Sequence, residues 1–329
     1  MAFILKYWGV RGSLPTAPSP EEWVKQFEGL MQGFFKDGYF GSDQIRDYIK
    51  SVPLPHIGGY GTATTCVELT SKNTQMIIDG GSGIRRLSEK MMSGQGGKGT
   101  GTYHIFLTHF HWDHLIGLPF FAPHFVAGNT VNYYAVQPEL EKMIRGKFSR
   151  PYFPVSFESL GAKVKFHKLE PRQPMILGEF TVTPYQLDHP DPCWGFRVEA
   201  QGKSYAHCVD TEATRSLESS LGPDLPLYRN ADLMYFDAQY TLPELAEKAN
   251  WGHSAAQVGL DIAFREKIKH VIFAHHDPGA DIHQIEALRQ QTQEYYEWRL
   301  HTAEMHKLKL PKVLWRYAYE GLEIDLEKL

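Results

Sequence analysis

The sequence has few cysteines, no long apolar run and no large excess of charge of either sign. Its 329 residues include three cysteines, an odd number that argues against a disulfide framework and favours a reducing compartment. No stretch reaches the 18 or so apolar residues of a membrane-spanning helix. The formal net charge of −4 gives no indication of a general cationic coat for nucleic acid or anionic lipid.

The opening segment, MAFILKYWGVRGSLP, lacks the features of a secretory signal peptide. Its apolar run is short, is broken by Gly9, Arg11 and Gly12, and is followed by no small-residue cleavage site. We therefore expect a soluble, cytoplasmic protein. The hydrophobic content of 42% is sufficient for a sizeable core.

Short β-type runs and helical patterns alternate along most of the chain. Examples are the runs at 64–71, 74–81 and 270–276 and the helical patterns at 254–267 and 282–301, the first of which opens with Ser254 and Gln257 at capping-box spacing. This alternation predicts a layered α/β or α+β domain. Residues 14–57 are rich in proline and scattered aromatics, and we interpret them as a lid-like insertion outside the central sheet.

The segment FLTHFHWDH, residues 106–114, carries four potential metal ligands: His109, His111, Asp113 and His114. Imidazole and carboxylate groups suit zinc, manganese or iron. So many ionisable groups after an apolar run would be poorly solvated without a partner. Their spacing lets His109 and His111 share one centre while Asp113 and His114 serve a second.

Three more apolar strands end in potential ligands: Asp188 and His189, Asp210, and His275 and His276. Loops at one end of a rigid sheet are where functional sites are usually built. With the first cluster, these strand ends supply enough ligands for two metal ions, including a carboxylate that can bridge them.

The segment THFHWDH resembles the HxHxDH signature of the metallo-β-lactamase-fold hydrolases. IIDGGSG is similar to the turn that precedes this signature in the superfamily. HPDPCWGFRVE, VDTE, WGHSAAQ and FAHHDP resemble motifs of its tRNase Z and phosphonate-pathway phosphodiesterase branch. The resemblance covers roughly residues 58–280. It implies an α/β αββα sandwich, formed as one domain over 1–329 with the insertion at about 14–57.

The resemblance also implies a ligand set. One divalent ion is held by His109, His111 and His189, and a second by Asp113, His114 and His275, with Asp210 bridging the two. Zinc is the first choice for both ions, with manganese or iron as alternatives. His275 is preferred to His276 because it takes the place of the ligand that follows the apolar strand.

The implied activity is that of a dinuclear phosphodiesterase. A hydroxide shared by the two ions would attack phosphorus, Asp113 would orient it, and His253 in WGHSAAQ would protonate the leaving group. The segment FDAQY, residues 236–240, stands where the family has HEAT, so the resemblance assigns no carboxylate partner to His253.

The substrate is expected to be a small phosphodiester, with a cyclic nucleotide as first choice. Asp210 follows His189 by only 21 residues, which leaves no room for a tRNA-gripping arm. We expect no stable nucleic-acid partner and no membrane; the resemblance makes a homodimer plausible. The rival functions are hydrolysis of a carbon ester, thioester or lactam, and a non-catalytic, metal-loaded nucleotide sensor.

Three further features lie near the motifs. Arg11 and Ser13 could contact a phosphate or simply serve a turn. Trp112 is expected to pack against its neighbours. The basic and aromatic segment KMIRGKFSRPYF, residues 142–153, could contact a phosphate or a base, but is interpreted as a solvated face.

Overall fold

The computed structural model describes residues 2–215 and 217–329, in which the strands form two seven-stranded sheets. In spatial order, the first sheet contains β14 (Glu323–Asp325), β1 (Phe3–Gly9), β2 (Cys66–Ser71), β3 (Thr74–Ile78), β4 (Thr102–Phe106), β5 (Thr130–Ala135) and β6 (Lys163–Lys168). The second contains β13 (Leu314–Tyr317), β12 (His270–Ala274), β11 (Leu233–Asp237), β10 (Lys203–Cys208), β9 (Trp194–Ala200), β8 (Phe180–Gln186) and β7 (Met175–Leu177).

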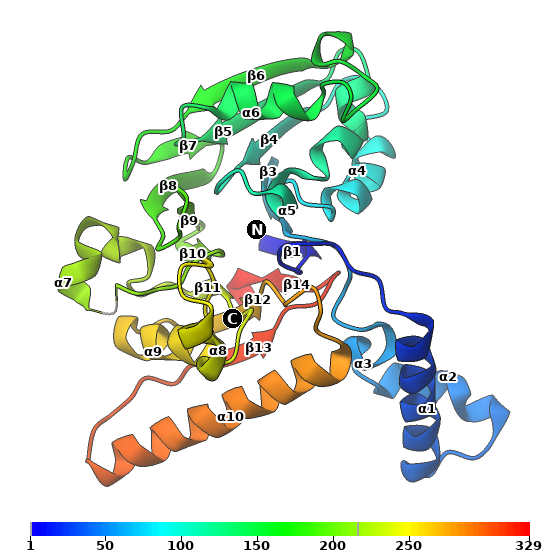
Figure 1. Ribbon diagram of the computed structural model, residues 1–329, viewed down its shortest axis with the longest axis vertical. Coiled ribbons are helices and arrows are strands. Elements are labelled where there is room, and N and C mark those ends of the chain that lie inside the picture. The colour runs from blue at the N-terminus through cyan, green and yellow to red at the C-terminus, as the bar shows by residue number, and fades with distance from the viewer. Residues whose placement is uncertain (1, 216) are drawn as a thin grey trace.

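The helices lie outside the two sheets (Figure 1). They are α1 (Pro20–Lys36), α2 (Ile45–Ser51), α3 (Leu54–Gly58), α4 (Ile84–Met92), α5 (Trp112–Leu115), α6 (Leu140–Lys147), α7 (Glu218–Leu221), α8 (Leu242–Glu247), α9 (Ala256–Glu266) and α10 (Ile282–Met305). Three apolar cores separate the layers: one between the sheets, one under α9 and α10, and one under α4 and α6. The predicted four-layer αββα fold is therefore confirmed.

The burial of each element follows its sequence pattern. Helix α4 buries Ile84, Leu87 and Met91, which recur on one face at helical spacing. Strand β11 is an apolar run that is buried on both faces, as expected of a strand between parallel neighbours β10 and β12. The predicted capping box of α9 is wrong, because the N-cap is Ala255, and the amide of Ser254 instead donates to Asp237.

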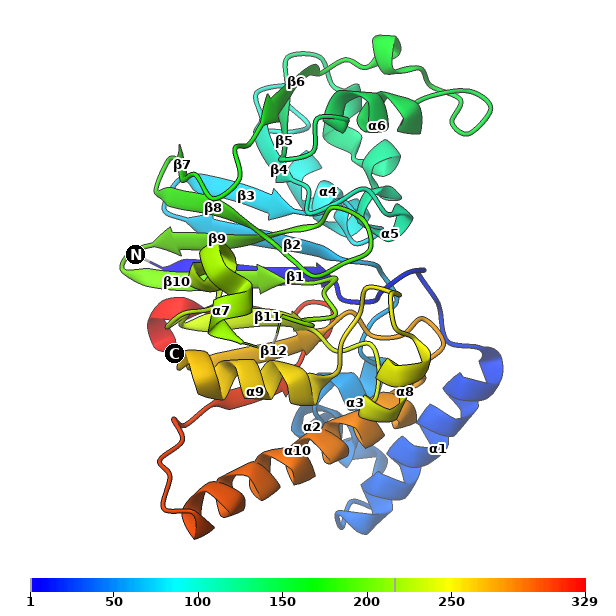
Figure 2. The same ribbon diagram turned by 60° about the vertical axis from the view of Figure 1, so that its left-hand side comes forward.

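The strands that precede the candidate ligands end at the same end of the sandwich (Figure 2). Strands β10, β11 and β12 run parallel, and β8 has the same direction because it pairs antiparallel with β9, which pairs antiparallel with β10. Strand β4 of the facing sheet ends at this place too. The loops after these strands can therefore bring side chains from both sheets together.

Helices α1 to α3, residues 20–58, form an N-terminal arm beside the start of α10 and outside both sheets (Figure 1). The capping box of Ser19 and Glu22 starts α1, and Phe34 packs edge-on against Tyr48 of α2. In the described part of the chain, no helix combines the length and the apolar content that crossing a membrane requires.

Candidate metal centre

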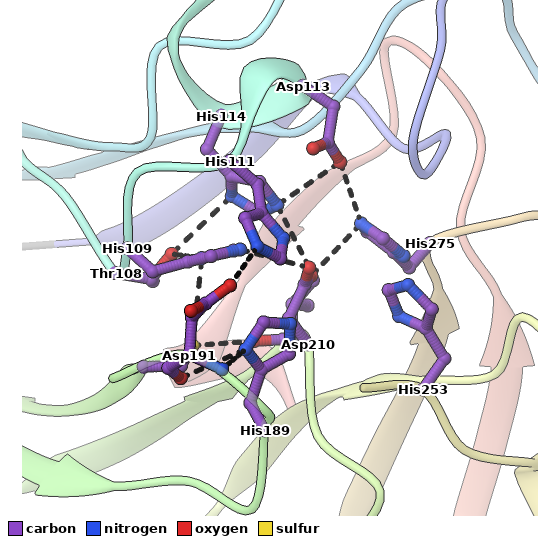
Figure 3. Close-up of polar contacts among 12 residues, drawn as sticks. Thr108, His109, His111, Asp113, His114, His189, Asp191, Asp210, His253 and His275 are labelled. Carbon is purple, nitrogen blue, oxygen red and sulfur yellow. Dashed lines mark hydrogen bonds and ion pairs between the residues drawn. The ribbon is translucent and has the colours of Figure 1, made fainter. Parts of the chain in front are cut away.

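The side chains expected to bind metal converge on one point between the two sheets (Figure 3). Three groups of ligand-type atoms each lie within 4.8 Å of one another in the described part of the chain. Two hold the predicted ligands: His109, His111, His189 and Asp210 in one, and Asp113, His114, Asp210 and His275 in the other. The third joins Asp210 and His275 to Asp237 and His253. All seven residues predicted as ligands lie in these first two groups, and their assignment as ligands remains a prediction. Asp210 is the residue that the two groups share.

Asp210 is in close contact with imidazoles from both groups. Its Oδ2 lies 3.4 Å from Nε2 of His109 and 3.3 Å from Nε2 of His114. Its Oδ1 lies 3.0 Å from Nε2 of His275. Oδ2 thus faces an imidazole of each group and Oδ1 faces a second imidazole of one group, so the carboxylate lies between the two groups, where a bridging ligand would be placed.

The polar atoms at the centre are buried but unsatisfied. Nε2 of His109, His114 and His189 and both carboxylate oxygens of Asp210 have no hydrogen-bond partner among the described residues. They approach one another without hydrogen-bond geometry, and an unpaired buried polar atom costs about 1–3 kcal/mol. Five such atoms converging from imidazole and carboxylate groups fit divalent cations with nitrogen and oxygen ligands.

Outer hydrogen bonds orient the imidazoles. Asp79 accepts from the amide of Thr108 at 2.9 Å and contacts Nδ1 of His114 at 2.8 Å. Oε1 of Gln239 lies 2.8 Å from Nδ1 of His275. With Nδ1 occupied in this way, Nε2 of each ring is left to face the centre, which is how histidine ligands are commonly oriented.

The electrostatics of the cluster favour positive charge. Burial disfavours a charged imidazole, and it lowers the pKa of His109 to about 4. Burial acts in the same direction on His275, yet Asp210 and Asp113 overcome it and raise the pKa of that residue to about 10. Burial alone would raise the pKa of Asp210, but the surrounding histidines hold it well below its usual range. The buried carboxylates therefore hold positive charge beside them.

The backbone is unusual at three of these positions. Asp79, Asp210 and His275 have φ values of 63°, 64° and 63°, in the left-handed region. Non-glycine residues rarely adopt this conformation, which costs of order 1 kcal/mol or more each and tends to cluster at functional sites. The backbone at Gly12 also lies close to the ring of His275, because a Cβ atom there would be 2.4 Å from Nδ1 of His275.

The neighbouring histidines 275 and 276 point to different places. His275 faces the cluster, as preferred from the sequence. Nε2 of His276 instead donates to the carbonyl of Ala318 at 2.8 Å, and its ring packs between Tyr60 and Tyr317. The geometry therefore offers only one of the pair to a metal ion.

His253 lies beside the cluster and has a carboxylate partner. Its Nδ1 is 2.9 Å from Oδ2 of Asp237, and its ring stacks 4.8 Å from that of His275. Asp237 also accepts from the amides of Asp210 and Gln239. The segment FDAQY, to which the resemblance assigned no such role, therefore supplies a carboxylate–histidine pair.

Sequence reasoning missed several contacts in this region. Oδ2 of Asp191 lies 2.9 Å from Nε2 of His111, and the amide of Ser13 donates to Asp113 at 2.9 Å. Only the short interval between Asp191 and His189 hinted at the first of these contacts.

Two residues interpreted from the sequence have clear places in the structure. The Arg11 guanidinium donates to backbone carbonyls, including that of Gly61, and so holds neighbouring loops together. The expectation that Trp112 packs is wrong, because it is 71% exposed.

Comparison with known proteins agrees with this geometry. Residues 74–276, more than half of the chain, match the family described as the beta-lactamase superfamily domain. A ribonuclease Z of Staphylococcus carnosus is 29% identical over 141 residues, which cover 41% of this chain and 42% of the relative. The match to that protein thus spans less than half of its length.

Two solved structures share the fold over nearly the whole chain. The metallo-beta-lactamase fold protein YhfI from Bacillus subtilis has a TM-score of 0.63 at 16% identity, with 98% of this chain and 99% of that chain covered. A diphosphatase from the PhnP family has a TM-score of 0.56 at 17% identity, with 98% and 97% covered. By its sequence match and its fold, this chain belongs to the β-lactamase superfamily.

Proposed function

We propose that the protein is a dinuclear metal-dependent phosphodiesterase that hydrolyses a small phosphodiester, with a cyclic nucleotide as the preferred class. The observation that carries the proposal is the single carboxylate of Asp210 shared by two groups of candidate ligands. Two divalent cations held there would polarise the phosphoryl oxygens and lower the pKa of a bound water. Zinc is our first choice, because imidazole nitrogens and carboxylate oxygens are among its usual ligands.

The neighbouring side chains fit the remaining tasks. Asp113 accepts from the backbone of Ser13, which fixes its carboxylate at the edge of the cluster, where it can orient the attacking nucleophile. Because Nδ1 of His253 bonds Asp237, its Nε2 is the atom available to give a proton to the leaving group. These roles for Asp113 and His253 are part of the proposal.

A small substrate is supported by the interval between His189 and Asp210. The chain there forms only the β9–β10 hairpin, which turns at Gln201 and Gly202. Helix α1 of the arm carries Glu21, Glu22 and Glu28 against two lysines, a charge balance that does not suit a phosphate backbone. The relative named ribonuclease Z makes RNA the principal competing substrate.

The test is a substrate screen of the metal-reconstituted protein. We expect cyclic nucleotides and aryl phosphodiesters to be hydrolysed much faster than precursor tRNA, carbon esters, thioesters or lactams. Efficient cleavage of a tRNA 3′ trailer would replace the proposal with a ribonuclease function. Tight nucleotide binding without hydrolysis of any diester would favour the alternative of a non-catalytic nucleotide sensor.

We also propose a homodimer through α1. Its outward face exposes Val24, Phe27, Met31 and Phe35 at helical spacing, with exposed fractions of 52–57%. An antiparallel pair with the same helix of a second copy would bury this face. It would also place the acidic first turn, with Glu21, against Lys36 in the last turn of the other helix.

A cytoplasmic location remains part of the proposal. It is supported by the cysteines, since Cys66, Cys193 and Cys208 are all buried as free thiols. Burial raises the pKa of each thiol well above its usual value, which keeps these groups unreactive.

A further inference from the structure

The short helix that carries Asp113 and His114 begins with an exposed aromatic side chain that the proposed chemistry does not use. Trp112 opens α5, directly between the candidate ligands His111 and Asp113. The next three residues of this short helix are buried, whereas Trp112 is 71% exposed. The helix therefore turns its carboxylate and imidazole inward and leaves the indole on the surface beside the site.

A lysine lies over this indole. Nζ of Lys147, the last residue of α6, is 5.2 Å from the centre of the Trp112 ring, within cation–π distance. Among residues 2–215 and 217–329, no carboxylate lies within ion-pair distance of Lys147. Arg145, two residues earlier, is paired with both Glu141 and Glu158. Burial lowers the pKa of the Lys147 ammonium, since this half-buried cation lacks an anionic partner.

The location of this pair suits substrate contact. Figure 2 shows α5, α6 and α8 at the same end of the sandwich, where the strands that carry the candidate ligands end. The segment after α6 adds Arg150 and an 82% exposed Tyr152. Aromatic faces stack on nucleobases whatever their sequence, and ammonium groups bind phosphate. A simple anion would use only the lysine and an apolar ligand only the indole, whereas a nucleotide would use both.

We propose that Trp112 and Lys147 form a nucleotide subsite beside the metal cluster. The indole stacks on a base, and the ammonium binds a second phosphate of the same substrate. This inference rests on the proposed phosphodiesterase function and narrows its substrate to a nucleotide with a base and a non-scissile phosphate, as in a linear or cyclic dinucleotide. A cyclic mononucleotide would occupy only half of the subsite.

Three diesters with the same nitrophenolate leaving group test this proposal. They are methyl p-nitrophenyl phosphate, the p-nitrophenyl ester of thymidine 5′-phosphate, and that thymidine ester with a 3′-phosphate. Trp112→Ala should raise KM for both thymidine esters, relative to the methyl ester, by roughly 10-fold, and Trp112→Phe should restore part of the loss. Lys147→Met should reduce the preference for the 3′-phosphorylated ester by roughly 10-fold.

Matched controls are available on the same chain. Trp298 on α10 is 56% exposed, and Lys142 is exposed on α6 itself. Trp298→Ala and Lys142→Met should leave all three KM values unchanged. If the Trp112 and Lys147 variants behave like these controls while the wild type hydrolyses the esters, the subsite is wrong and the phosphodiesterase proposal stands.

A binding measurement tests the nucleotide subsite independently of the proposed phosphodiesterase activity. Calorimetric titration of the metal-loaded protein with thymidine 3′,5′-bisphosphate should show binding that Trp112→Ala and Lys147→Met each weaken. Such binding in a protein that hydrolyses no diester would support the subsite and refute the proposed activity. Equal affinity in the wild type and both variants would overturn the subsite.

Discussion

The metal cluster and the N-terminal arm depart from the usual distribution of polar and apolar groups in opposite directions. The cluster buries histidines and carboxylates, and Asp210 at its centre is only 1% exposed. The arm instead exposes large apolar side chains such as Phe27 and Met31, each 57% exposed. Buried polar groups without partners and apolar side chains exposed to water each cost free energy unless a further group pairs with or covers them. Both regions therefore suit partners from outside the chain, a cation in the first and a protein surface in the second.

The two regions also differ in how firmly they are held. Each imidazole of the cluster is oriented by a neighbour, such as Asp79 behind His114 or Gln239 behind His275. The arm contacts the body through few interactions, among them the bond from His56 to Glu286 near the start of α10. Substitutions should accordingly have large effects on the cluster and small ones on the arm.

The largest effect is expected from Asp210→Ala, which removes the carboxylate shared by both groups. Metal content, measured by mass spectrometry after reconstitution, should fall from near two equivalents to below one. Phosphodiesterase activity should fall by roughly 10³-fold or more. Asp232→Ala is the control, because Asp232 is also buried but binds Ser204 and Lys269 near the starts of β10 and β12, away from the strand ends that carry the candidate ligands. Full phosphodiesterase activity in the metal-free protein would refute the proposal that the buried cluster needs a cation.

His253→Ala should lower kcat by roughly 10²–10⁴-fold, the range for loss of a general acid, with metal content unchanged. The loss should be smaller for nitrophenyl esters, whose leaving group needs little protonation. The control is His270→Ala, at the opposite end of β12. Loss of metal in the His253 variant would mean that this residue is a ligand. Equal losses for good and poor leaving groups would instead assign it to phosphate binding.

Asp79→Asn should have an intermediate effect, because Asp79 is not itself in the candidate ligand groups and acts on them through His114 and Thr108. The loss of metal affinity should be about 10–100-fold, the usual result of removing an outer hydrogen-bond partner. Competition with a metal-binding dye measures this affinity. Asp232→Asn, which removes a carboxylate that binds Ser204 and Lys269, should leave it unchanged. Equal metal affinities in the two variants would show that the hydrogen bonds of Asp79 do not contribute to metal binding.

The smallest effect on the protomer is expected from Phe27→Glu in the arm. Because this side chain is exposed, the free energy of unfolding of the protomer should change by no more than about 0.5 kcal/mol. The variant should nevertheless be monomeric by light scattering at concentrations where the wild type is dimeric. Leu308→Glu, a similarly exposed apolar position at 66%, should leave the dimer intact. A monomeric wild type would refute the proposal that the arm binds a second copy of the chain.

Local signals in the sequence predicted a layered α/β or α+β domain with ligand-type side chains at four strand ends, whereas the αββα sandwich and the ligand set were predicted from the resemblance carried by short motifs such as THFHWDH. The apolar run before His109 predicts a strand, and the strand end predicts where its side chain lies. Contacts that join distant segments left no such signal: Asp191 faces His111, and Ser13 reaches Asp113, only after the sheets have stacked. The exposure of Trp112 was also missed, because a short sequence pattern does not show which face of a four-residue helix is covered.

The spread of the cluster along the chain has a consequence for biosynthesis. His109 is made early and His275 late, and the cluster draws on both sheets. At a ribosome speed of about 5–20 residues per second, roughly 10–30 s separate the emergence of the first and last candidate ligands. During the first part of that time, before Asp210 emerges, the nascent chain presents the histidines and the aspartate of THFHWDH without the carboxylate that joins the two groups. Correct metal loading must therefore follow translation of the second sheet, and metal captured earlier would have to be released or rearranged.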